Sequence, residues 1–460
     1  MTVTGRGERG AGRGRVSHVA APPEYRGTTR QVCGLWPWAV GGMTPTIGVP
    51  LGHNIRTGRW VGCDPISWFD EAHLIAQPSF VMLGRPALGK STAVRVIASG
   101  LAGLATPLIS GDLKGEYCAL IEALGGQVIT LGRGEGALNV LDTGALDHAA
   151  TRIGGVGASA LREEAHGRRL NIVRALLAIV RGRPTEDSED IILNAALRYL
   201  RKHWRRKLAP VIPDLIRVIR DVRPDELRVV AVDHGSDERY RDATDGLVRS
   251  LIALCDGPLG NMFARQTAAR LRLDAPGVGI DVSALNDNDP QLQAAALGAC
   301  WSEVFGTVEA NNALADAGLI PQRRFLIIVD EMWQFDRAGH GLDQFVNSLT
   351  RLNRDKGVGQ ILISHSGADM STGYLERAGA FVCFGLPRRE LEALREIVAF
   401  TDEEVDLIAS WSTPPGWVVD NPPGRGLCVV KVGERPGIPL SVDLVEAEAG
   451  LHNTSKRWAA

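Results

Sequence analysis

Residues 84–91 form a phosphate-loop motif, which constrains the fold of the chain more than any other feature. The segment reads Gly-Arg-Pro-Ala-Leu-Gly-Lys-Ser and matches G-x-x-x-x-G-K-[ST] at every fixed position. A short apolar run at 80–83 precedes it, and an amphipathic pattern over 91–104 follows it. A strand, a glycine-rich turn and a helix in this order are the context in which such a loop binds phosphate. The sequence therefore predicts a nucleotide-binding α/β protein, although a chain with 53 glycines can also match the motif by chance.

Each residue type in the loop has a physical role. Gly84 and Gly89 allow a turn tight enough for successive N–H groups, together with the positive end of the helix, to converge on a β-phosphate. Lys90 brings a charge to the β- and γ-phosphates, the Ser91 hydroxyl is expected to bind Mg²⁺, and Thr92 is placed to contact the α-phosphate. The expected nucleotide-binding residues are Gly84, Arg85, Pro86, Ala87, Leu88, Gly89, Lys90, Ser91 and Thr92.

Composition bounds the class of protein. The chain has 460 residues, enough for two or three domains, and its 45% hydrophobic and 23% charged residues are typical of globular proteins. A net charge of −2 argues against nucleic-acid binding by bulk charge but leaves room for a local basic patch. Without an apolar run near 20 residues or a signal-peptide core, we expect a cytoplasmic protein unless a partner holds it at a membrane. The seven cysteines include no C-x-x-C pair, which predicts reduced thiols and neither a zinc site nor a disulfide framework.

The apolar pattern divides the chain into six segments. Strand and helix signals alternate on both sides of a purely helical block, as in a parallel sheet that carries an all-helical insertion. Strands are expected at 80–83, 107–110, 127–131, 279–282, 325–329, 360–364, 380–384 and 427–432. The segments are a flexible basic tail (1–33), a lead-in with short strands (34–78), a first core part with the phosphate loop (79–150), the helical insertion (151–265), a second core part (266–445) and a terminal tail (446–460).

The apolar run at 325–329 ends in two carboxylates, Asp330 and Glu331. A Walker B strand has this arrangement, because the strand is buried while its last residues project at the carboxyl edge of the sheet, where open α/β folds bind ligands. Asp330 is expected to hold Mg²⁺ through water, and Glu331 to orient or deprotonate the attacking water. Two solvated acids after a core strand are the alternative, which the phosphate loop in the same chain disfavours.

Polar and basic residues around the next expected strand complete the candidate catalytic set. That strand ends in Ser364 and His365, and His365 either senses the γ-phosphate or the lytic water or is an ordinary surface histidine. Arg351, Arg354 and Lys356 precede the strand. They supply either an arginine finger to the nucleotide of a neighbouring subunit or a solvated helix face, and Arg354 is the favoured finger.

A second conspicuous segment, Gly-Asp-Leu-Lys-Gly-Glu-Tyr, occupies residues 111–117. Asp112 and Glu116 follow the strand that we expect beside the phosphate loop. They are therefore candidates to contact Mg²⁺ or to couple the site to a bound substrate. A plain turn with helix-capping acids would have a similar sequence.

Taken together, these motifs resemble the ATPases of the HerA/FtsK superfamily, in particular the C-terminal motor domain of the large conjugation ATPase of type IV secretion systems. The likeness rests on the phosphate loop, the D-x-K-G-E-Y segment with its L-G-G and N-x-L-D followers, the helical insertion, the Asp330-Glu331 pair and an R-x-x-R-x-K stretch before a polar strand end. It covers roughly residues 45–435, and the ordered co-occurrence is more specific than any one motif. It implies a RecA-like P-loop NTPase core of the α/β class, with a mostly parallel sheet, helices on both faces and an all-α insertion.

The resemblance also implies ligands and partners. ATP and Mg²⁺ are the expected cofactors, a homo-hexameric ring is the expected assembly, and the cytoplasmic face of a membrane-docked transfer channel is the expected location. Three features depart from the family pattern. Only about seventy residues precede the motor region, Pro86-Ala87-Leu88 stands where a glycine is common, and Ser364-His365 replaces the usual Thr-Gln strand end.

Three functions are compatible with these residues. The first is an ATPase that supplies energy to a conjugative or type IV-like apparatus. The second is a DNA-translocating motor or coupling protein, in which a basic cluster around Trp204 contacts phosphates, although such a helix is usually a solvated face. The third is a nucleotide-gated scaffold without significant hydrolysis, which the intact Asp330-Glu331 pair disfavours. The basic cluster comprises Arg198, Arg201, Lys202, Arg205, Arg206 and Lys207.

Overall fold

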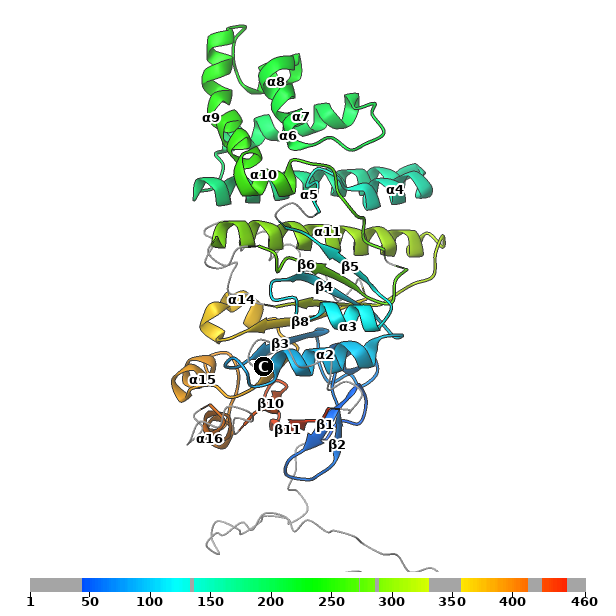
Figure 1. Cartoon of the computed structure of the whole chain (residues 1–460), viewed down its shortest axis with the longest axis vertical. Helices are drawn as coiled ribbons and strands as arrows, with labels where there is room; N and C mark the ends of the chain where they lie inside the picture. The colour runs from blue at the N-terminus through cyan, green and yellow to red at the C-terminus, as the bar shows by residue number, and fades with distance from the viewer. Residues whose placement is uncertain are drawn as a thin grey trace, which may run out of the picture.

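The computed structural model has an elongated shape, with a sheet toward one end and a stack of helices at the other (Figure 1). It describes residues 44–132, 136–272, 274–285, 289–330, 357–412 and 424–444. The expected tails at 1–33 and 446–460 lie outside these ranges. Glu331, Arg351, Arg354 and Lys356 also lie outside them, so their candidate roles stay predictions.

The described strands form one 11-stranded sheet with the order β2-β1-β11-β10-β9-β3-β8-β7-β4-β6-β5. Pairing is parallel from β9 to β5 and antiparallel from β2 to β9. This mostly parallel sheet confirms the expected α/β class. The strands are β1 (Pro50–Asn54), β2 (Trp60–Gly62), β3 (Ser79–Leu83), β4 (Thr106–Asp112), β5 (Gln127–Thr130), β6 (Val278–Asp281), β7 (Phe325–Val329), β8 (Val358–Ser364), β9 (Ala380–Cys383), β10 (Leu427–Lys431) and β11 (Ile438–Val442).

Helices cover both faces of this sheet. In β3, Phe80 and Met82 pack into the core beneath α1, α2 and α3, whereas Val81 and Leu83 pack into the core shared with α11, α15 and α16. Successive residues of a strand point to opposite faces, so the wholly apolar run of β3 fills both cores. The core helices are α1 (Pro65–Asp70), α2 (Lys90–Leu101), α3 (Cys118–Ala123), α11 (Pro290–Asp316), α14 (Thr372–Leu375), α15 (Arg388–Leu394) and α16 (Asp402–Ser410).

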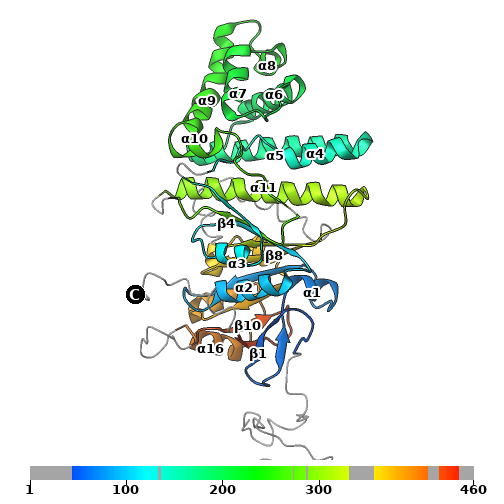
Figure 2. The same cartoon turned by 45° about the vertical axis from the view of Figure 1, so that its right-hand side comes forward.

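The helix α11 separates the sheet from the remaining helices, which stack beyond it (Figures 1 and 2). It is buried over most of its surface because it is packed between two layers. The buried Trp301 donates its indole N–H to the carbonyl of Ser110 at 3.0 Å, and the Leu297 side chain lies where a Cβ on Gly111 would come within 2.4 Å. The outer helices are α4 (Gly144–Ile153), α5 (Gly155–Arg181), α6 (Asp187–His203), α7 (Ile212–Arg217) with a π-helical turn (Val218–Val222), α8 (Asp225–Val230), α9 (Asp237–Cys255) and α10 (Gly257–Phe263).

Among the described residues, the elements from α4 to α10 are all helical and no strand interrupts them, while the expected bounds of the insertion at 151–265 stay a prediction. The helix after the phosphate loop was expected to reach residue 104 but ends at Leu101, because Ala102 has an extended backbone and Gly103 after it adopts a left-handed φ of +110°. Within the described ranges, no helix is both long enough and apolar enough to cross a lipid bilayer.

The expected position of β4 beside the phosphate-loop strand is wrong. β8 and β7 lie between β3 and β4, although both come more than 200 residues later in the chain. The local pattern that predicts each strand carries no information on which later strand will insert beside it. Asp112 and Glu116 therefore follow a strand that is three places from the phosphate loop.

The segments before and after the core join the same sheet. β1 pairs with both β2 and β11, and β10 pairs with β9, so these strands extend one edge of the sheet. Helix α1 was not expected in this region. Asp64 caps it by accepting hydrogen bonds from the N–H groups of Ile66 and Ser67, at 3.0 and 2.7 Å, and Pro65 starts its first turn.

Glu303 on α11 lines a small cavity of about 30 Å³ between this helix, α4 and α5. Burial, and then the charge of Asp142, raise the pKa of Glu303 to about 7, against an ordinary value of 4.5. Arg270 and Arg168 act in the opposite direction. The folded state therefore keeps a proton that the unfolded chain releases, so the contribution of Glu303 to stability is greatest below pH 4.5 and is lost as the pH rises through 7.

Replacing Glu303 with glutamine removes this linkage. We expect E303Q to lie within about 1 kcal/mol of the wild type at pH 5 and to be about 3 kcal/mol more stable at pH 8. Urea unfolding followed by tryptophan fluorescence measures this difference. Glu238→Gln on the exposed face of α9 is the control, and parallel pH profiles for E303Q and the wild type would contradict the assignment.

Candidate functional site

The carboxyl ends of four adjacent parallel strands bring the predicted site residues to one edge of the sheet. The phosphate loop follows β3, His365 follows β8, Asp330 follows β7 and Asp112 ends β4. The register aligns these ends, since Leu83 of β3 pairs with Ser364 of β8. Open α/β sheets bind their ligands at this edge.

The phosphate loop has a backbone that few side chains tolerate. Gly84 and Gly89 have φ angles of +155° and +101°, and a Cβ on Gly84 would lie 2.6 Å from the Cβ of Phe384. Ala87 also has a left-handed φ, of +65°. Such a conformation costs an L-residue about 1–2 kcal/mol, which gives a physical reason for glycine to be common in the middle of such loops.

Lys90 begins helix α2 and turns its side chain back into the loop. Its ammonium donates to the carbonyl oxygens of Gly84 at 2.5 Å and Arg85 at 3.1 Å, and it lies 3.2 Å from Nδ1 of His365. The residue is 7% exposed. The structure thus brings together a cation, the loop and the candidate sensor, although the motifs containing Lys90 and His365 are 275 residues apart.

The other loop residues are positioned by the C-terminal quarter of the chain. Arg85 donates its backbone N–H to Gly385 at 3.1 Å and its guanidinium to the carbonyl of Ser412 at 3.0 Å. The carbonyl of Leu88 accepts from the N–H of Gly426 at 2.9 Å. Ser91 and Thr92 lie in the first turn of α2 and are half-buried, while Pro86 and Ala87 are exposed at the tip of the loop.

Asp330 is held by a residue of the segment 111–117. The phenol of Tyr117 donates to Oδ2 of Asp330 at 2.9 Å. Tyr117 is 1% exposed, and burial, then the nearby Asp330 charge, raise its pKa well above the ordinary value, so it stays a protonated donor. This contact fixes the carboxylate that the sequence assigns to Mg²⁺.

Asp112 and Glu116 serve the turn between β4 and α3. The Asp112 carboxylate accepts backbone N–H groups from Tyr117 at 2.7 Å and Lys114 at 3.2 Å, while burial raises its pKa. Glu116 forms an ion pair with Arg95 at 3.1 Å. These contacts hold the turn, although no side chain caps α3, and the candidate role of both acids at Mg²⁺ stays a prediction.

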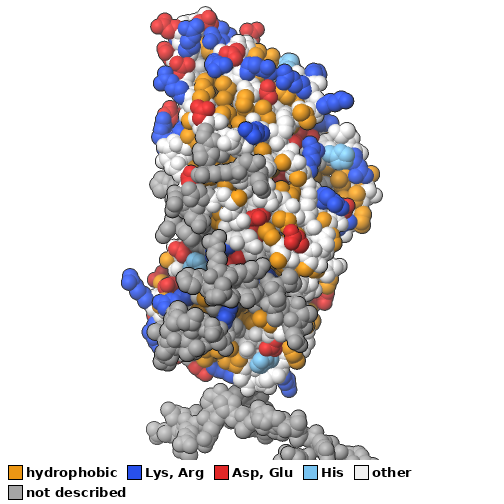
Figure 3. All heavy atoms as spheres, viewed as in Figure 1, with side chains coloured by type: hydrophobic (Ala, Val, Ile, Leu, Met, Phe, Trp, Pro, Cys, Tyr) orange, Lys and Arg blue, Asp and Glu red, His pale blue; other side chains and the backbone are white. Residues whose placement is uncertain are grey.

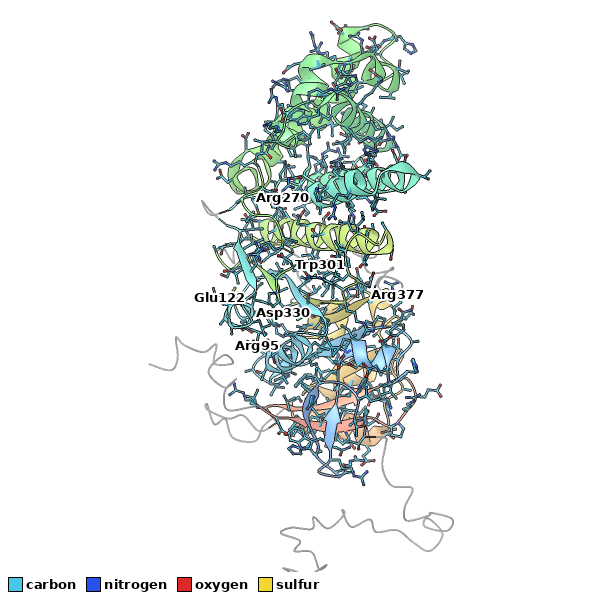
Figure 4. The ribbon with its side chains drawn as sticks, turned by 90° about the vertical axis from the view of Figure 1, so that its right-hand side faces the viewer. Arg95, Glu122, Arg270, Trp301, Asp330 and Arg377 are labelled. Carbon is cyan, nitrogen blue, oxygen red and sulfur yellow. The ribbon has the colours of Figure 1, made fainter. Side chains whose placement is uncertain are left out.

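Two residues of this network, Tyr117 and Arg95, were missed by the sequence reasoning. Arg95 lies on α2, the helix after the phosphate loop, and is 1% exposed. Its guanidinium lies 5.7 Å from the centre of the Tyr117 ring. Figure 4 shows Arg95 and Asp330 in neighbouring parts of the molecule. In the sequence, Arg95 is the one charged residue in the apolar stretch from Ala93 to Ala98, and this pattern could have identified it. A buried charge is retained only where it is paired.

We expect Tyr117→Phe to lower ATP turnover about 10-fold while leaving nucleotide affinity within about 2-fold, because the lost hydrogen bond to a charged group is worth about 1.5 kcal/mol. Steady-state kinetics and equilibrium nucleotide binding measure the two effects. Tyr199→Phe, on the distant helix α6, is the matched control. Equal turnover in both variants would show that Asp330 needs no such support.

The residues at this edge fit a nucleotide with Mg²⁺. Ser364 beside the phosphate loop is 1% exposed, and its hydroxyl makes no hydrogen bond within the described part of the chain. This hydroxyl is therefore available to hydrogen-bond to a ligand. No three His, Cys, Asp or Glu residues among those described cluster as a metal site. A Mg²⁺ ion on a phosphate loop needs none, because a hydroxyl such as that of Ser91, phosphate oxygens and water supply its ligands.

The predicted basic cluster does not lie at this edge. Arg198, Arg201 and Lys202 are on α6, at the helical end of the molecule, and Arg205, Arg206 and Lys207 follow it (Figure 1). Figure 3 shows Lys and Arg side chains at that end.

A phosphate loop at the end of a central parallel strand, with an acidic strand end two places away in the same sheet, defines the fold of a P-loop ATPase. The comparison with one solved structure agrees with this fold. The solved structure of VirB4 from Thermoanaerobacter pseudethanolicus matches with a TM-score of 0.65 and 18% sequence identity, over 89% of this chain and 99% of that chain. The α/β fold with a phosphate loop that the motifs predict is therefore confirmed.

Weaker matches accompany it. The bacterial conjugative coupling protein TrwBdeltaN70 matches with a TM-score of 0.46 and 13% identity, over 80% of this chain and 85% of that chain. TrwB in complex with ADP and Mg²⁺ matches with a TM-score of 0.45 and 13% identity, over 81% and 87%. Neither a protein-family model nor a curated protein sequence matches this chain.

Proposed function

We propose that this protein is an ATP-hydrolysing motor of a conjugative or type IV secretion-like apparatus, which uses Mg-ATP to drive substrate transfer or channel assembly. The observation that carries the proposal is the convergence of the phosphate loop, His365 and Asp330 at the ends of three adjacent strands. The ordered motifs of the sequence and the likeness of the fold to VirB4 over nearly the whole of both chains support the choice of apparatus.

Each residue has a proposed task in hydrolysis. The N–H groups of the loop and the Lys90 ammonium hold the β- and γ-phosphates, and Ser91 and Asp330 hold Mg²⁺, which neutralises charge on the phosphates when bound. Glu331 orients and deprotonates the attacking water. His365, within reach of Lys90, senses the γ-phosphate at the end of β8.

A ring completes the proposed machine. Six copies assemble so that Arg354 or Arg351 of one subunit reaches the γ-phosphate held by its neighbour and stabilises charge in the transition state. The ring docks through membrane-bound channel components at the inner face of the cell membrane. Without such an arginine, hydrolysis by a single copy would be slow.

The second candidate function is a DNA-translocating motor of the HerA/FtsK or coupling-protein type, in which Arg198, Arg201, Lys202, Arg205, Arg206 and Lys207 contact DNA. The concentration of these cations at one end of an otherwise nearly neutral chain favours it. The third candidate, a scaffold that binds ATP without hydrolysing it, has no use for a catalytic base such as the one proposed at Glu331.

Steady-state ATP hydrolysis with and without single- and double-stranded DNA separates the three. The wild type is compared with Glu331→Gln in each condition. Turnover that Glu331→Gln abolishes and DNA leaves unchanged supports the secretion motor, whereas turnover raised severalfold by DNA supports the DNA motor. Nucleotide binding without turnover in either protein would overturn both in favour of the scaffold.

A further inference from the structure

A groove of about 830 Å³ lies on the helical part of the molecule, well away from the phosphate loop. Its walls come from α4, α5 and α6, from the segment 204–210 that follows α6, and from Arg270. Its volume is at the upper end of the range for sites that enclose small molecules. Segments distant in sequence thus build one surface feature, which extends beyond the basic cluster on α6.

The lining of this groove is strongly positive. Eight Lys or Arg side chains line it, and only three carboxylates do. One carboxylate, that of Glu163, lies 3.2 Å from Arg198 and 2.9 Å from Arg201, so two guanidinium groups share a single anion. The whole chain carries a net charge of −2, so this positive surplus is local and raises the concentration of anions at the groove.

The outer cations are weakly paired. Lys202 lies 3.9 Å from Glu226 and Arg206 lies 4.0 Å from Asp214, both with largely exposed side chains. Asp214 itself is largely buried, but both cations are exposed. Ion pairs of exposed cations at such distances contribute about 0–1 kcal/mol, so a phosphate can bind these cations at little cost. Six of the eight cations are arginines, whose planar forks match phosphate oxygens in pairs.

An aromatic residue adds a second mode of contact. The indole N–H of Trp204 donates to the carbonyl of Leu208 at 2.7 Å, which holds the ring against the turn after α6. The Arg206 guanidinium lies 5.2 Å from the centre of that ring. Indole and guanidinium faces are the surfaces on which unpaired bases stack, and an acidic peptide has no equivalent group.

We infer that this groove binds single-stranded nucleic acid, with its arginines on the phosphates and the Trp204 and Arg206 pair beside a base. The inference deepens the proposed function by naming a substrate class for the helical part. It rests on that function only where it makes the bound nucleic acid a substrate of the motor. Binding itself needs no nucleotide at the phosphate loop.

The test is fluorescence anisotropy of the full chain with a labelled twenty-nucleotide oligothymidine, without ATP, at 50 and 200 mM salt. The variant Lys202→Glu/Arg206→Glu/Lys207→Glu reverses three groove cations. The matched control, Arg239→Glu/Arg241→Glu/Arg249→Glu, makes the same charge change on the exposed surface of α9, outside the groove. Circular dichroism and thermal unfolding establish that both variants fold.

We expect the groove variant to weaken binding at least 10-fold and to reduce the salt dependence by about two to three phosphate contacts, while the control stays within about 2-fold of the wild type. Equal weakening in both variants, or no binding by the wild type, would overturn the inference. So would tighter binding of a duplex of the same length, or equal groove-dependent binding of polyglutamate. Oligothymidine binding by a protein that does not hydrolyse ATP would contradict the proposed function but would still support this inference.

Discussion

Lys90→Ala is expected to weaken ATP binding about 100-fold and to abolish hydrolysis. Lys90 is 7% exposed, and its ammonium is held by the carbonyls of Gly84 and Arg85, in the loop where the phosphates are expected. A charge-assisted hydrogen bond in such a place is worth about 1.5–3 kcal/mol, and about 2.7 kcal/mol corresponds to the expected 100-fold. Titration with a fluorescent ATP analogue measures the affinity.

Arg249→Ala is the control for this substitution, because it removes one positive charge from the exposed face of α9, far from the sheet edge. It should bind ATP as tightly as the wild type. Thermal unfolding of Lys90→Ala shows whether the loop still folds. Wild-type affinity in a folded Lys90→Ala protein would place the nucleotide elsewhere.

Asp330→Asn is expected to lower ATP turnover about 100-fold while changing ATP affinity less than 10-fold. Asparagine keeps the shape of the side chain and an oxygen that accepts from Tyr117, so the contact at 2.9 Å can persist. What it loses is the negative charge that holds Mg²⁺ and its water, which we estimate at about 3 kcal/mol of transition-state stabilisation. Turnover measured across a Mg²⁺ titration tests this.

Asp281→Asn provides the matched comparison. Asp281 ends β6 at the same edge of the sheet, but it pairs in register with Asp112 and lies beyond β4 from the phosphate loop. The same loss of charge there should leave turnover within about 2-fold. If both variants lost activity equally, the effect would belong to the charge of the whole edge and not to Asp330.

The local parts of this fold could be predicted because each is contiguous in sequence. The phosphate loop, the run from Phe325 to Asp330 and the strand that ends at Ser364 appear where the apolar pattern placed them. Their meeting at one edge also follows, since parallel strands align their carboxyl ends. The Lys90 contact to His365 is a direct result of that alignment.

Sheet order and side-chain partners could not be predicted in the same way. Nothing local in β4 reveals that β7 and β8 insert between it and β3, because that order depends on a chain crossing more than 200 residues later. Tyr117 was passed over for Asp112 and Glu116, because acids are the usual ligands of Mg²⁺. Its role became visible only when the fold placed its hydroxyl on Asp330.

The groove on the helical part also could not be predicted in full from the sequence. The run of cations after residue 197 was evident in the sequence, but Arg270 and the α4 and α5 residues that form the opposite wall were not. Arg270 lies beside the helical layers next to α11, far from the cluster in sequence (Figure 4). A basic helix alone is usually a solvated face, and its enclosure by other elements distinguishes this one.

Release of phosphate from ATP by the purified wild type, in one series with Lys90→Ala and with the wild type in EDTA, tests the central claim most directly. If the edge formed by β3, β8 and β7 is a hydrolytic Mg-ATP site, the wild type releases phosphate with Mg²⁺ and both other samples fall to background. Equal release in all three samples, or none from a wild type that binds Mg-ATP, would contradict it.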